Sequence, residues 1–473
     1  MEMATFPITA TYVKRAAAKG QLIIVVDPKW TPLVRYSTVW LQPKLGADIA
    51  LLNGLVHIII KNGWIDRRFI EERVEGGMEA FSDLEELVTR YTPEFVSGIT
   101  GVPAENLNLA ARLYATSPTA MIATGMGMSQ QVTGTHNVFC LINMMLVTGQ
   151  VGRERCGINP PRGQNNVQGV TDVGCSPVNC PGYIPVTDDD NRRKVAKVWD
   201  VPYESLSPRP GLTTVEIMQA AYKGKIKGIF IMGENPMISD PNLNHTEEAL
   251  NRMEFVVVQD IFLTETTRLA DVVLPASAWG EKEGTFVNSD RRVLRARKAV
   301  ECPGTARIDW RIIHELSRRM GKPMPDYRDE SEIFDEIARV TPIMAGISYS
   351  RLEEGSIQWP CPTNDHPGTP TLYLERFNTP TGRGRLFPVD YVPQNEFTDS
   401  EYPLMLNSGR VKVESRRGEL ETQVRISEEV LIGEVFMPWH FTESQVNRLT
   451  RDELDPYSRI APFKLSAVRI HKI

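Results

Sequence analysis

The chain has 473 residues, which is enough for about three domains of ordinary size. Its 41% of hydrophobic and 24% of charged residues are ordinary for a globular protein, and a net charge of -6 argues against nucleic-acid binding, which usually needs a basic patch. The six cysteines are scattered and include no C-x-x-C pair, which excludes a recognisable zinc or iron–sulfur motif.

The first residues, MEMATFP, lack the basic and apolar regions of a secretory signal. The longest apolar stretches, such as residues 48–61, are too short and too polar to span a bilayer. Low cysteine use fits a reducing compartment. We therefore expect no membrane span in this chain and a cytoplasmic location, with a periplasmic one left open.

Apolar runs alternate with helical patterns over most of the chain. A short helix is expected over residues 10–18 and an amphipathic one over residues 49–62, with Asp48 near its N-cap. Short apolar runs predict buried strands, and these lie at residues 21–26, 120–123, 228–232, 255–259 and 271–274. The alternation predicts an α/β fold of doubly wound, mostly parallel sheets in two nucleotide-binding-like domains.

Polar or glycine-rich turns follow these strands, and in open α/β sheets ligands bind beyond the carboxyl ends of the strands. Asp27 and Asp260 could each accept hydrogen bonds from a ribose or a guanine, or could equally cap the following helix. The turn Gly125-Met126-Gly127 could bring backbone amides close to a phosphate or a pterin, although a lone G-x-G is a weak signal. The turn at residues 233–236, GENP, could likewise approach a nucleotide.

The most unusual stretch is PRGQNNVQG at residues 161–169, with one arginine, four amides and two glycines. Because buried amides must be hydrogen-bonded, such a cluster either ties a loop together or faces a polar ligand. Arg162 carries a permanent charge on a planar fork that suits a carboxylate. Composition alone leaves a surface loop with a solvated arginine equally open.

The remaining segments point less clearly to a function. Residues 279–292, WGEKEGTFVNSDRR, are interpreted as a solvated charged turn, and residues 360–370 as a linker. The histidines show no ligand spacing. From Tyr402 onward, short β-rich segments separated by turns predict a small C-terminal β-barrel.

Taken together, these segments resemble the molybdopterin oxidoreductase family, and within it the catalytic (alpha) subunit of formate dehydrogenases. The matching segments run in family order along nearly the whole chain: VVDPKWT, LGADIALLNGL, GMGMSQ, PPRGQNNVQG, MGENPMISDP, VVQDIFLTET, ADVVLPASAWGEKEGTFVNSDRR and the closing FMPWHF, NRLT and PFKLSAVRI. Each motif alone is weak, whereas the ordered set is specific. The stretch RGQNNVQG is similar to the formate dehydrogenase branch.

The resemblance implies reversible two-electron oxidation of formate to CO2 at a bis-(molybdopterin guanine dinucleotide) centre that holds Mo or W. It implies electron-transfer partner subunits with iron–sulfur clusters or flavin. Arg162 would bind the formate carboxylate, with Gly163 and Gln164 beside the pterin. The other expected cofactor-binding residues are Asp27, Gly46, Asp48, Met126, Gly127, Gln130, Gly233, Glu234, Asn235, Gln259, Asp260, Asp309, Arg410, Asn447 and Lys464.

The sequence departs from the family pattern in two places. Family members carry an N-terminal segment with a four-cysteine iron–sulfur site and then a cysteine or selenocysteine metal ligand, and this chain begins after that point. We therefore expect no metal ligand and no [4Fe-4S] ligation from this segment. In relatives, several tens of residues also follow the position of Val411, so we expect no tight hairpin at residues 410–412, which carry no Asn-Gly or Asp-Gly turn.

The expected domains are residues 1–120, an α/β part of the dinucleotide site, residues 121–395, a second α/β domain, and residues 396–473, a barrel shortened after residue 411. Three functions stay open. The first is formate dehydrogenase. The second is another activity of the family, such as nitrate reduction. The third is a non-catalytic fragment or scaffold subunit that has lost the metal.

Overall fold

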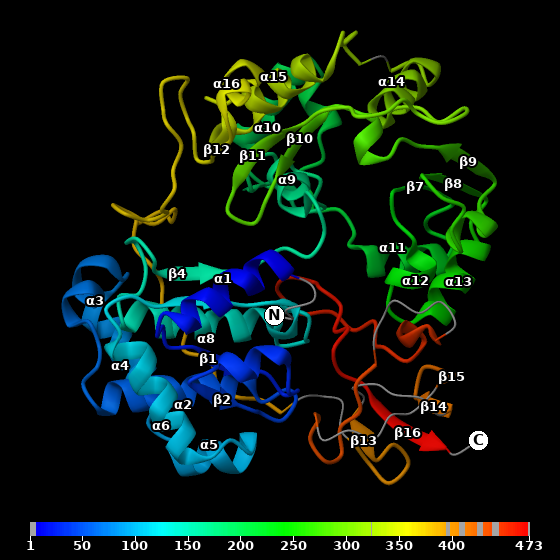
Figure 1. Ribbon diagram of the computed structural model, residues 1–473. Helices are drawn as coiled ribbons and strands as arrows, with labels where there is room; N and C mark the ends of the chain where they lie inside the picture. Colours follow the sequence, from blue (N-terminus) through cyan, green and yellow to red (C-terminus); the bar gives the residue numbers. More distant parts are fainter. Residues whose placement is uncertain are drawn as a thin grey trace. The chain divides into compact units, whose positions relative to one another are not determined.

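The computed structural model describes residues 6–322, 324–393, 398–405, 412–422, 429–437 and 444–471. The chain, drawn as a ribbon in Figure 1, divides into two compact units. The first unit contains residues 1–161 together with 371–473, and the second contains residues 162–370. The three expected domains are defined by family resemblance, and their boundaries stay a prediction.

The first unit is built around α2 (Asp48–Lys61), which is buried on nearly every side. Four helices surround it: α4 (Gly77–Val88), α5 (Pro93–Thr100), α6 (Ala104–Thr116) and α8 (Gly134–Val147). The expectation of an amphipathic helix is therefore wrong, because a helix that is apolar all round belongs in a core. Asn53 of α2 donates to the Val389 carbonyl at 2.8 Å, which fixes the returning segment on this core.

Two short parallel sheets lie in the same unit. Strand β1 (Ile24–Val26) pairs with β2 (Val39–Leu41), and β3 (Met121–Ala123) pairs with β4 (Gly157–Asn159). The predicted strands at residues 21–26 and 120–123 are present as β1 and β3, although β1 is shorter than the apolar run. Each pairs in parallel with a strand that the sequence did not predict. The remaining helices of this part are α1 (Pro7–Ala18), α3 (Arg67–Arg73) and α7 (Met126–Ser129).

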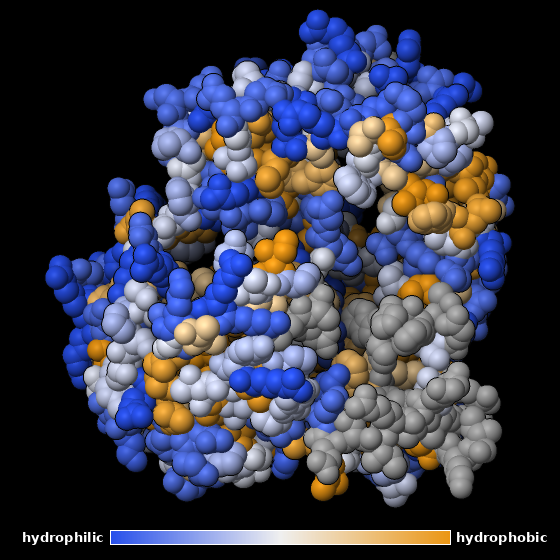
Figure 2. All heavy atoms as spheres, in the orientation of Figure 1, coloured by the Kyte–Doolittle hydropathy of each residue, from blue (hydrophilic) through white to orange (hydrophobic). Residues whose placement is uncertain are grey.

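The second unit contains a three-stranded parallel sheet in the order β7 (Gly228–Met232), β8 (Phe255–Asp260), β9 (Val272–Pro275). Helices α11 (Thr214–Tyr222) and α13 (Leu243–Asn251) cover one face. Figure 2 shows apolar residues gathered at the surface over this sheet, where Phe230, Met232 and Phe255 are exposed. The expectation that residues 228–232 form a buried strand is only partly correct, because they form β7 but every second residue of β7 points to solvent.

The segment expected to be a solvated turn forms part of a second sheet. Strand β10 (Gly284–Val287) pairs antiparallel with β11 (Arg292–Ala296), which pairs with β12 (Ile357–Gln358). Val287 and Val293 face each other in the register and are buried, which explains why residues 279–292 do not stay in solvent. The unit also contains β5 (Asn179–Cys180), β6 (Ile184–Pro185), α9 (Val167–Asp172), α10 (Asp189–Trp199), α12 (Pro236–Ser239), α14 (Asp309–Arg319), α15 (Glu330–Val340) and α16 (Tyr349–Glu354).

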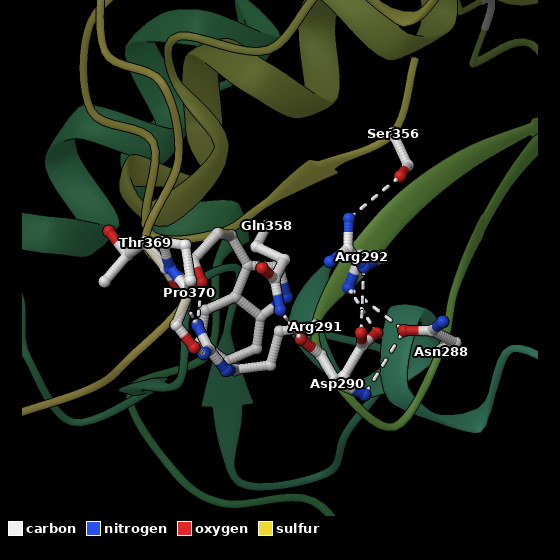
Figure 3. Close-up of polar contacts among 9 residues, drawn as sticks. Asn288, Asp290, Arg291, Arg292, Ser356, Gln358, Thr369 and Pro370 are labelled. Atoms are coloured by element: carbon white, nitrogen blue, oxygen red, sulfur yellow. Dashed lines mark hydrogen bonds and ion pairs between the residues drawn. The ribbon is translucent and has the colours of Figure 1, made fainter. Parts of the chain in front are cut away.

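Residues 360–370 do not behave as a linker over their whole length. The Arg291 guanidinium donates to the carbonyls of Trp359, Thr369 (3.0 Å) and Pro370 (3.1 Å) (Figure 3). Cys361 is fully buried. A single arginine therefore satisfies several carbonyls of an extended segment and holds that segment against the β11–β12 edge.

The C-terminal segment forms an antiparallel sheet in the order β13 (Leu404–Met405), β16 (Ala467–His471), β14 (Lys412–Ser415), β15 (Glu419–Glu421). Val413, Leu449 and Val468 are fully buried in its core. The described strands make one open sheet, and no closed barrel is present among them. The expected break at residues 410–412 falls on Arg410 and Val411, which lie outside the described residues, and Lys412 begins β14.

In the part of the chain that the structure describes, every helix is too short or too polar to cross a membrane.

Candidate functional site

The first group of expected site residues lies where β1 ends and α2 begins. Asp27 directly follows β1, and its Oδ1 accepts a hydrogen bond from the Lys29 amide at 2.9 Å. Gly46 has a φ of 76°, a left-handed conformation that favours glycine, and it turns the chain into α2. Asp48 is the first residue of α2, where the helix dipole favours a negative charge.

Gln131 connects this group to the turn after β3. Its Nε2 donates to Asp48 Oδ2 at 3.0 Å and to the Gly127 carbonyl at 2.5 Å. Burial raises the pKa of Asp48, and the hydrogen bond from Gln131 opposes that shift. The structure thus brings together Asp48 and the Met126–Gly127 turn, which the sequence analysis assigned separately. Gln131 itself was not predicted as a site residue, although it directly follows the expected Gln130.

Three buried polar atoms belong to residues that follow β3 or end β4. They are Thr124 Oγ1, Gln130 Oε1 and Asn159 Oδ1, and none has a hydrogen-bond partner among the described residues. Strand pairing places Ala123 opposite Asn159, so both strand ends lie at one edge. Because buried polar groups are normally bonded, these atoms fit a ligand rich in donors.

Glycines leave the same edge open. A Cβ built on Gly125 or Gly127 would meet no heavy atom within 4 Å. Backbone amides at this turn can therefore approach a large ligand closely. Together with the unbonded atoms of Thr124, Gln130 and Asn159, this opening suits a large polar ligand.

Within the first unit, the C-terminal segment contacts the N-terminal part at several turns. The Leu45 amide, beside Gly46, donates to Glu434 Oε1 at 3.3 Å, and burial raises the pKa of Glu434 to about 7. Asp455 accepts from the backbone (3.1 Å) and hydroxyl (2.8 Å) of Thr135 just after the start of α8. Asn447 is buried and Lys464 is half-buried. Their role toward a cofactor stays a prediction, and Arg410 lies outside the described residues.

The second group of expected residues lies in the second unit at the ends of β7 and β8. Gly233 has a φ of 61°, and its amide donates to the Gln259 carbonyl at 2.9 Å. The buried Gln259 donates through Nε2 to Asp309 Oδ1 at 2.8 Å, and its Oε1 has no partner among the described residues. Asp260 Oδ1 accepts from the amides of Ile261 (2.6 Å) and Phe262 (3.1 Å). Gly233, Gln259, Asp260 and Asp309 therefore form one group at one sheet edge.

The side chain of Asn235, which follows β7, is bonded to the segment that follows β8. Its Nδ2 donates to Glu265 at 2.8 Å, and its Oδ1 accepts from the amide (3.2 Å) and the hydroxyl (2.6 Å) of Thr266. These bonds use both lone pairs of Oδ1 and one of the two hydrogens on Nδ2, so the side chain connects two turns and keeps one donor. Its role toward a cofactor stays a prediction.

Glu234 lies beside a second, buried carboxylate. Ser239 donates to Glu234 Oε1 at 2.6 Å, and Asp240 Oδ2 is buried without a partner among the described residues. Burial, and then the charge of Glu234, raise the pKa of Asp240 to about 7. This pair is a protonation-sensitive point next to the expected nucleotide site.

The raised pKa of Asp240 has a consequence for stability. Between pH 4 and pH 7 the folded chain holds a proton on Asp240 that the unfolded chain releases, so this group makes the protein less stable as pH rises. We expect Asp240→Asn to remove the effect, which is worth up to about 4 kcal/mol for a shift of about three pKa units. Thermal unfolding should show the variant gaining on the wild type from pH 5 to pH 8. Glu234→Gln should give a smaller gain, and a pH-independent difference for Asp240→Asn would contradict the assignment.

The stretch PRGQNNVQG lies at the start of the second unit, and its amides differ in burial. Asn166 Oδ1 accepts from the Val287 amide at 2.9 Å, and Gln168 is buried, so these two tie the loop to its surroundings. Arg162, Gly163 and Gln164 are exposed.

The guanidinium of Arg162 is fixed at one end and open at the other. The Arg162 amide donates to Ser289 Oγ at 2.8 Å, and its Nε donates to Gln168 Oε1 at 3.0 Å. Nη1 and Nη2 have no partner among the residues that the structure describes. Two parallel donors are thus available to a planar anion. Ser289 and Gln168 hold this arginine, and neither role was predicted from the sequence.

Within the described ranges, no three His, Cys, Asp or Glu side chains lie close enough together to hold a metal ion. The expected common contact of Gly127, Gln164, Gly233 and Asp260 with one cofactor also stays a prediction, because Gly127 lies in the first unit and the other three lie in the second.

Parallel strands ending at open, polar turns define an α/β protein built to bind a large polar cofactor. The molybdopterin oxidoreductase model matches residues 3–319, and the molydopterin dinucleotide binding domain matches residues 407–467. This chain therefore belongs to the molybdopterin oxidoreductase family.

Curated proteins and a solved structure of related sequence or fold are also similar to this chain. The chain is 38% identical to F420-dependent formate dehydrogenase 1 subunit alpha of Methanococcus maripaludis, over 99% of this chain and 74% of that protein. It is 34% identical to the assimilatory nitrate reductase catalytic subunit of Bacillus subtilis, over 98% of this chain and 72% of that protein. Acetylene hydratase from Pelobacter acetylenicus has the same fold, with a TM-score of 0.73 at 18% identity, over 97% of this chain and 75% of that chain.

The chain spans about three quarters of the length of these curated relatives. The alignment with the methanococcal subunit covers 511 positions, whereas this chain has 473 residues, so that relative carries residues opposite gaps in this chain.

Proposed function

We propose that this chain is the catalytic subunit of a molybdenum- or tungsten-dependent formate dehydrogenase. The observation that carries the proposal is the exposed Arg162 fork, which is held at Nε and leaves two parallel donors for a carboxylate. The identity to a formate dehydrogenase alpha subunit over 99% of the chain supports it.

The cofactor would be a bis-(molybdopterin guanine dinucleotide). In the first unit, Asp27, Gly46 and Asp48 would line one nucleotide, and Met126, Gly127 and Gln130 would lie near a pterin. In the second unit, the other guanosine would meet Gly233, Glu234, Asn235, Gln259, Asp260 and Asp309. Gly163 and Gln164 would lie beside the pterin, and Arg410, Asn447 and Lys464 would close the site. The unbonded buried atoms and the open glycines support this assignment.

The reaction converts HCOO⁻ into CO2, a proton and two electrons. The metal-bound cofactor supplies the two-electron acceptor when it is present. Arg162 would bind both carboxylate oxygens, which leaves the C–H bond pointing away from the guanidinium. Fixing the substrate in one orientation removes rotational freedom before the reaction, and that is the largest contribution this residue can make. The electrons would pass to iron–sulfur or flavin subunits.

Nitrate reduction is the second candidate, because a guanidinium also suits nitrate and a nitrate reductase subunit is 34% identical. The purified enzyme, with the subunits that accompany it, should contain Mo or W and guanine nucleotide. It should also reduce a viologen dye with formate. A preparation without metal or nucleotide would favour a scaffold role instead, and oxidation of reduced dye by nitrate without a formate reaction would favour nitrate reduction.

A further inference from the structure

A buried hydrogen-bond network lies directly behind Arg162. At its centre is Asp172, the last residue of α9, which is completely buried. Its Oδ1 accepts from Gln168 Nε2 at 2.7 Å and from the Tyr183 hydroxyl at 2.6 Å. Its Oδ2 accepts from Trp359 Nε1 at 2.7 Å. Three such donors offset much of the cost of burying an ionised carboxylate.

The direction of these bonds sets the orientation of Gln168. A carboxylate only accepts hydrogen bonds, so the NH2 end of the Gln168 side chain must face Asp172. The same NH2 group donates to the Tyr183 hydroxyl at 2.8 Å, and that hydroxyl in turn donates a hydrogen bond to Asp172. The oxygen end of Gln168 therefore faces outward, where it accepts from Arg162 Nε at 3.0 Å.

We propose that Asp172 is a positioning residue that acts through Gln168 to fix the Arg162 fork for its carboxylate substrate. This inference rests on the proposed function and adds the source of the arginine's orientation. With Nε held, the guanidinium plane is set and Nη1 and Nη2 point to one place. If the Gln168 amide were reversed, its NH2 group would face the Nε–H of Arg162, and two donors would repel each other.

The pKa directions agree with this arrangement. Burial raises the pKa of Asp172, whereas Tyr183, Gln168, Trp359 and the charge of Arg162 all oppose the shift. Burial and Asp172 together raise the pKa of Tyr183, which keeps its hydroxyl a donor. The network thus runs in one direction, from the donors around Asp172 to the acceptor that holds Arg162.

Exchanging the amide and the carboxylate tests the proposal in the holoenzyme. Asp172→Asn allows the Gln168 amide to reverse, and we expect the KM for formate to rise about 10-fold or more with a smaller change in kcat. Gln168→Met removes the acceptor with little change in volume and should have the same effect. The double variant Asp172→Asn, Gln168→Glu restores an acceptor toward Arg162 and a donor–acceptor pair behind it. We expect its KM to return to within about 3-fold of the wild type.

Trp359→Phe is the matched control. It removes the donor on Oδ2 but leaves the pair that orients Gln168, so the melting temperature should fall while the KM stays near the wild-type value. Overturning results would be a normal KM in both Asp172→Asn and Gln168→Met, or a double variant worse than either single one. If instead Arg162→Lys itself left the KM unchanged, the proposed function would fail first, and this outcome is distinct from the other two.

Discussion

Replacing Arg162 by lysine should lower kcat/KM for formate by roughly 10- to 1000-fold, or about 1.4 to 4 kcal/mol of lost transition-state stabilisation. Arg162 reaches Gln168 with Nε and keeps two further nitrogens for a carboxylate. A lysine carries one nitrogen, which cannot both satisfy Gln168 and form two parallel bonds to formate. The KM should rise because substrate binding loses the fork.

Cofactor content separates the possible roles of this residue. Because Arg162 is assigned to the substrate, Mo or W and guanine nucleotide should remain near the wild-type level in Arg162→Lys. Arg297→Lys is a suitable control, since Arg297 lies in the same unit, is exposed and pairs with Glu353. Normal formate kinetics in Arg162→Lys would remove this arginine from the substrate site. Joint loss of cofactor and activity would make it a structural or pterin-binding residue.

Gly134→Ala should be among the most destabilising single substitutions in the first unit. Gly134 is the buried first residue of α8, and a Cβ there would lie 2.0 Å from the carbonyl oxygen of Ser129. That oxygen is backbone, so the turn between α7 and α8 must move as a whole. We expect a loss of about 3 kcal/mol, seen as a melting temperature lower by at least about 5 °C, and substoichiometric cofactor.

Gly127→Ala lies a few residues away and should behave in the opposite way. A Cβ at Gly127 meets no protein atom within 4 Å, and alanine is the better helix former by about 1 kcal/mol. The cofactor-free protein should be as stable as the wild type, whereas cofactor content should fall because the methyl group occupies the space left for the ligand. Full cofactor content with normal activity would remove Gly127 from the site.

Local rules predicted β3, β7, β8 and β9, but they missed β2 and β4, which pair with β1 and β3, and the antiparallel strands β10 to β12. The apolar runs at residues 120–123, 228–232 and 255–259 correspond to β3, β7 and β8, because a short apolar run that ends at a polar turn has few alternatives to a strand. Burial was harder to predict. Phe230 and Met232 are as apolar as core residues but lie on the uncovered face of β7, and only the number of covering helices decides that.

The candidate site shows the same division. The ordered motifs contain the proposed site residues Arg162, Gln259 and Asp260, but they do not predict what each side chain contacts. Gln168 and Asp172 lie within or just after the motif at residues 161–169, yet Tyr183 and Trp359 join them from distant positions. Such long-range partners follow from the tertiary fold and leave no local pattern. Asn235 is the converse case, since it lies in a ligand-like motif but its side chain is bonded to Glu265 and Thr266, which follow the next strand.

The stoichiometry of formate oxidation tests most directly whether this chain is the formate-oxidising subunit. The purified enzyme is supplied with ¹³C-formate and a one-electron viologen dye, and ¹³CO2 and reduced dye are measured together. One ¹³CO2 and two reduced dye molecules should appear for each formate consumed, and this yield should collapse in Arg162→Lys. Metal-loaded enzyme that releases no ¹³CO2 from formate, yet oxidises reduced dye with nitrate, would contradict the account.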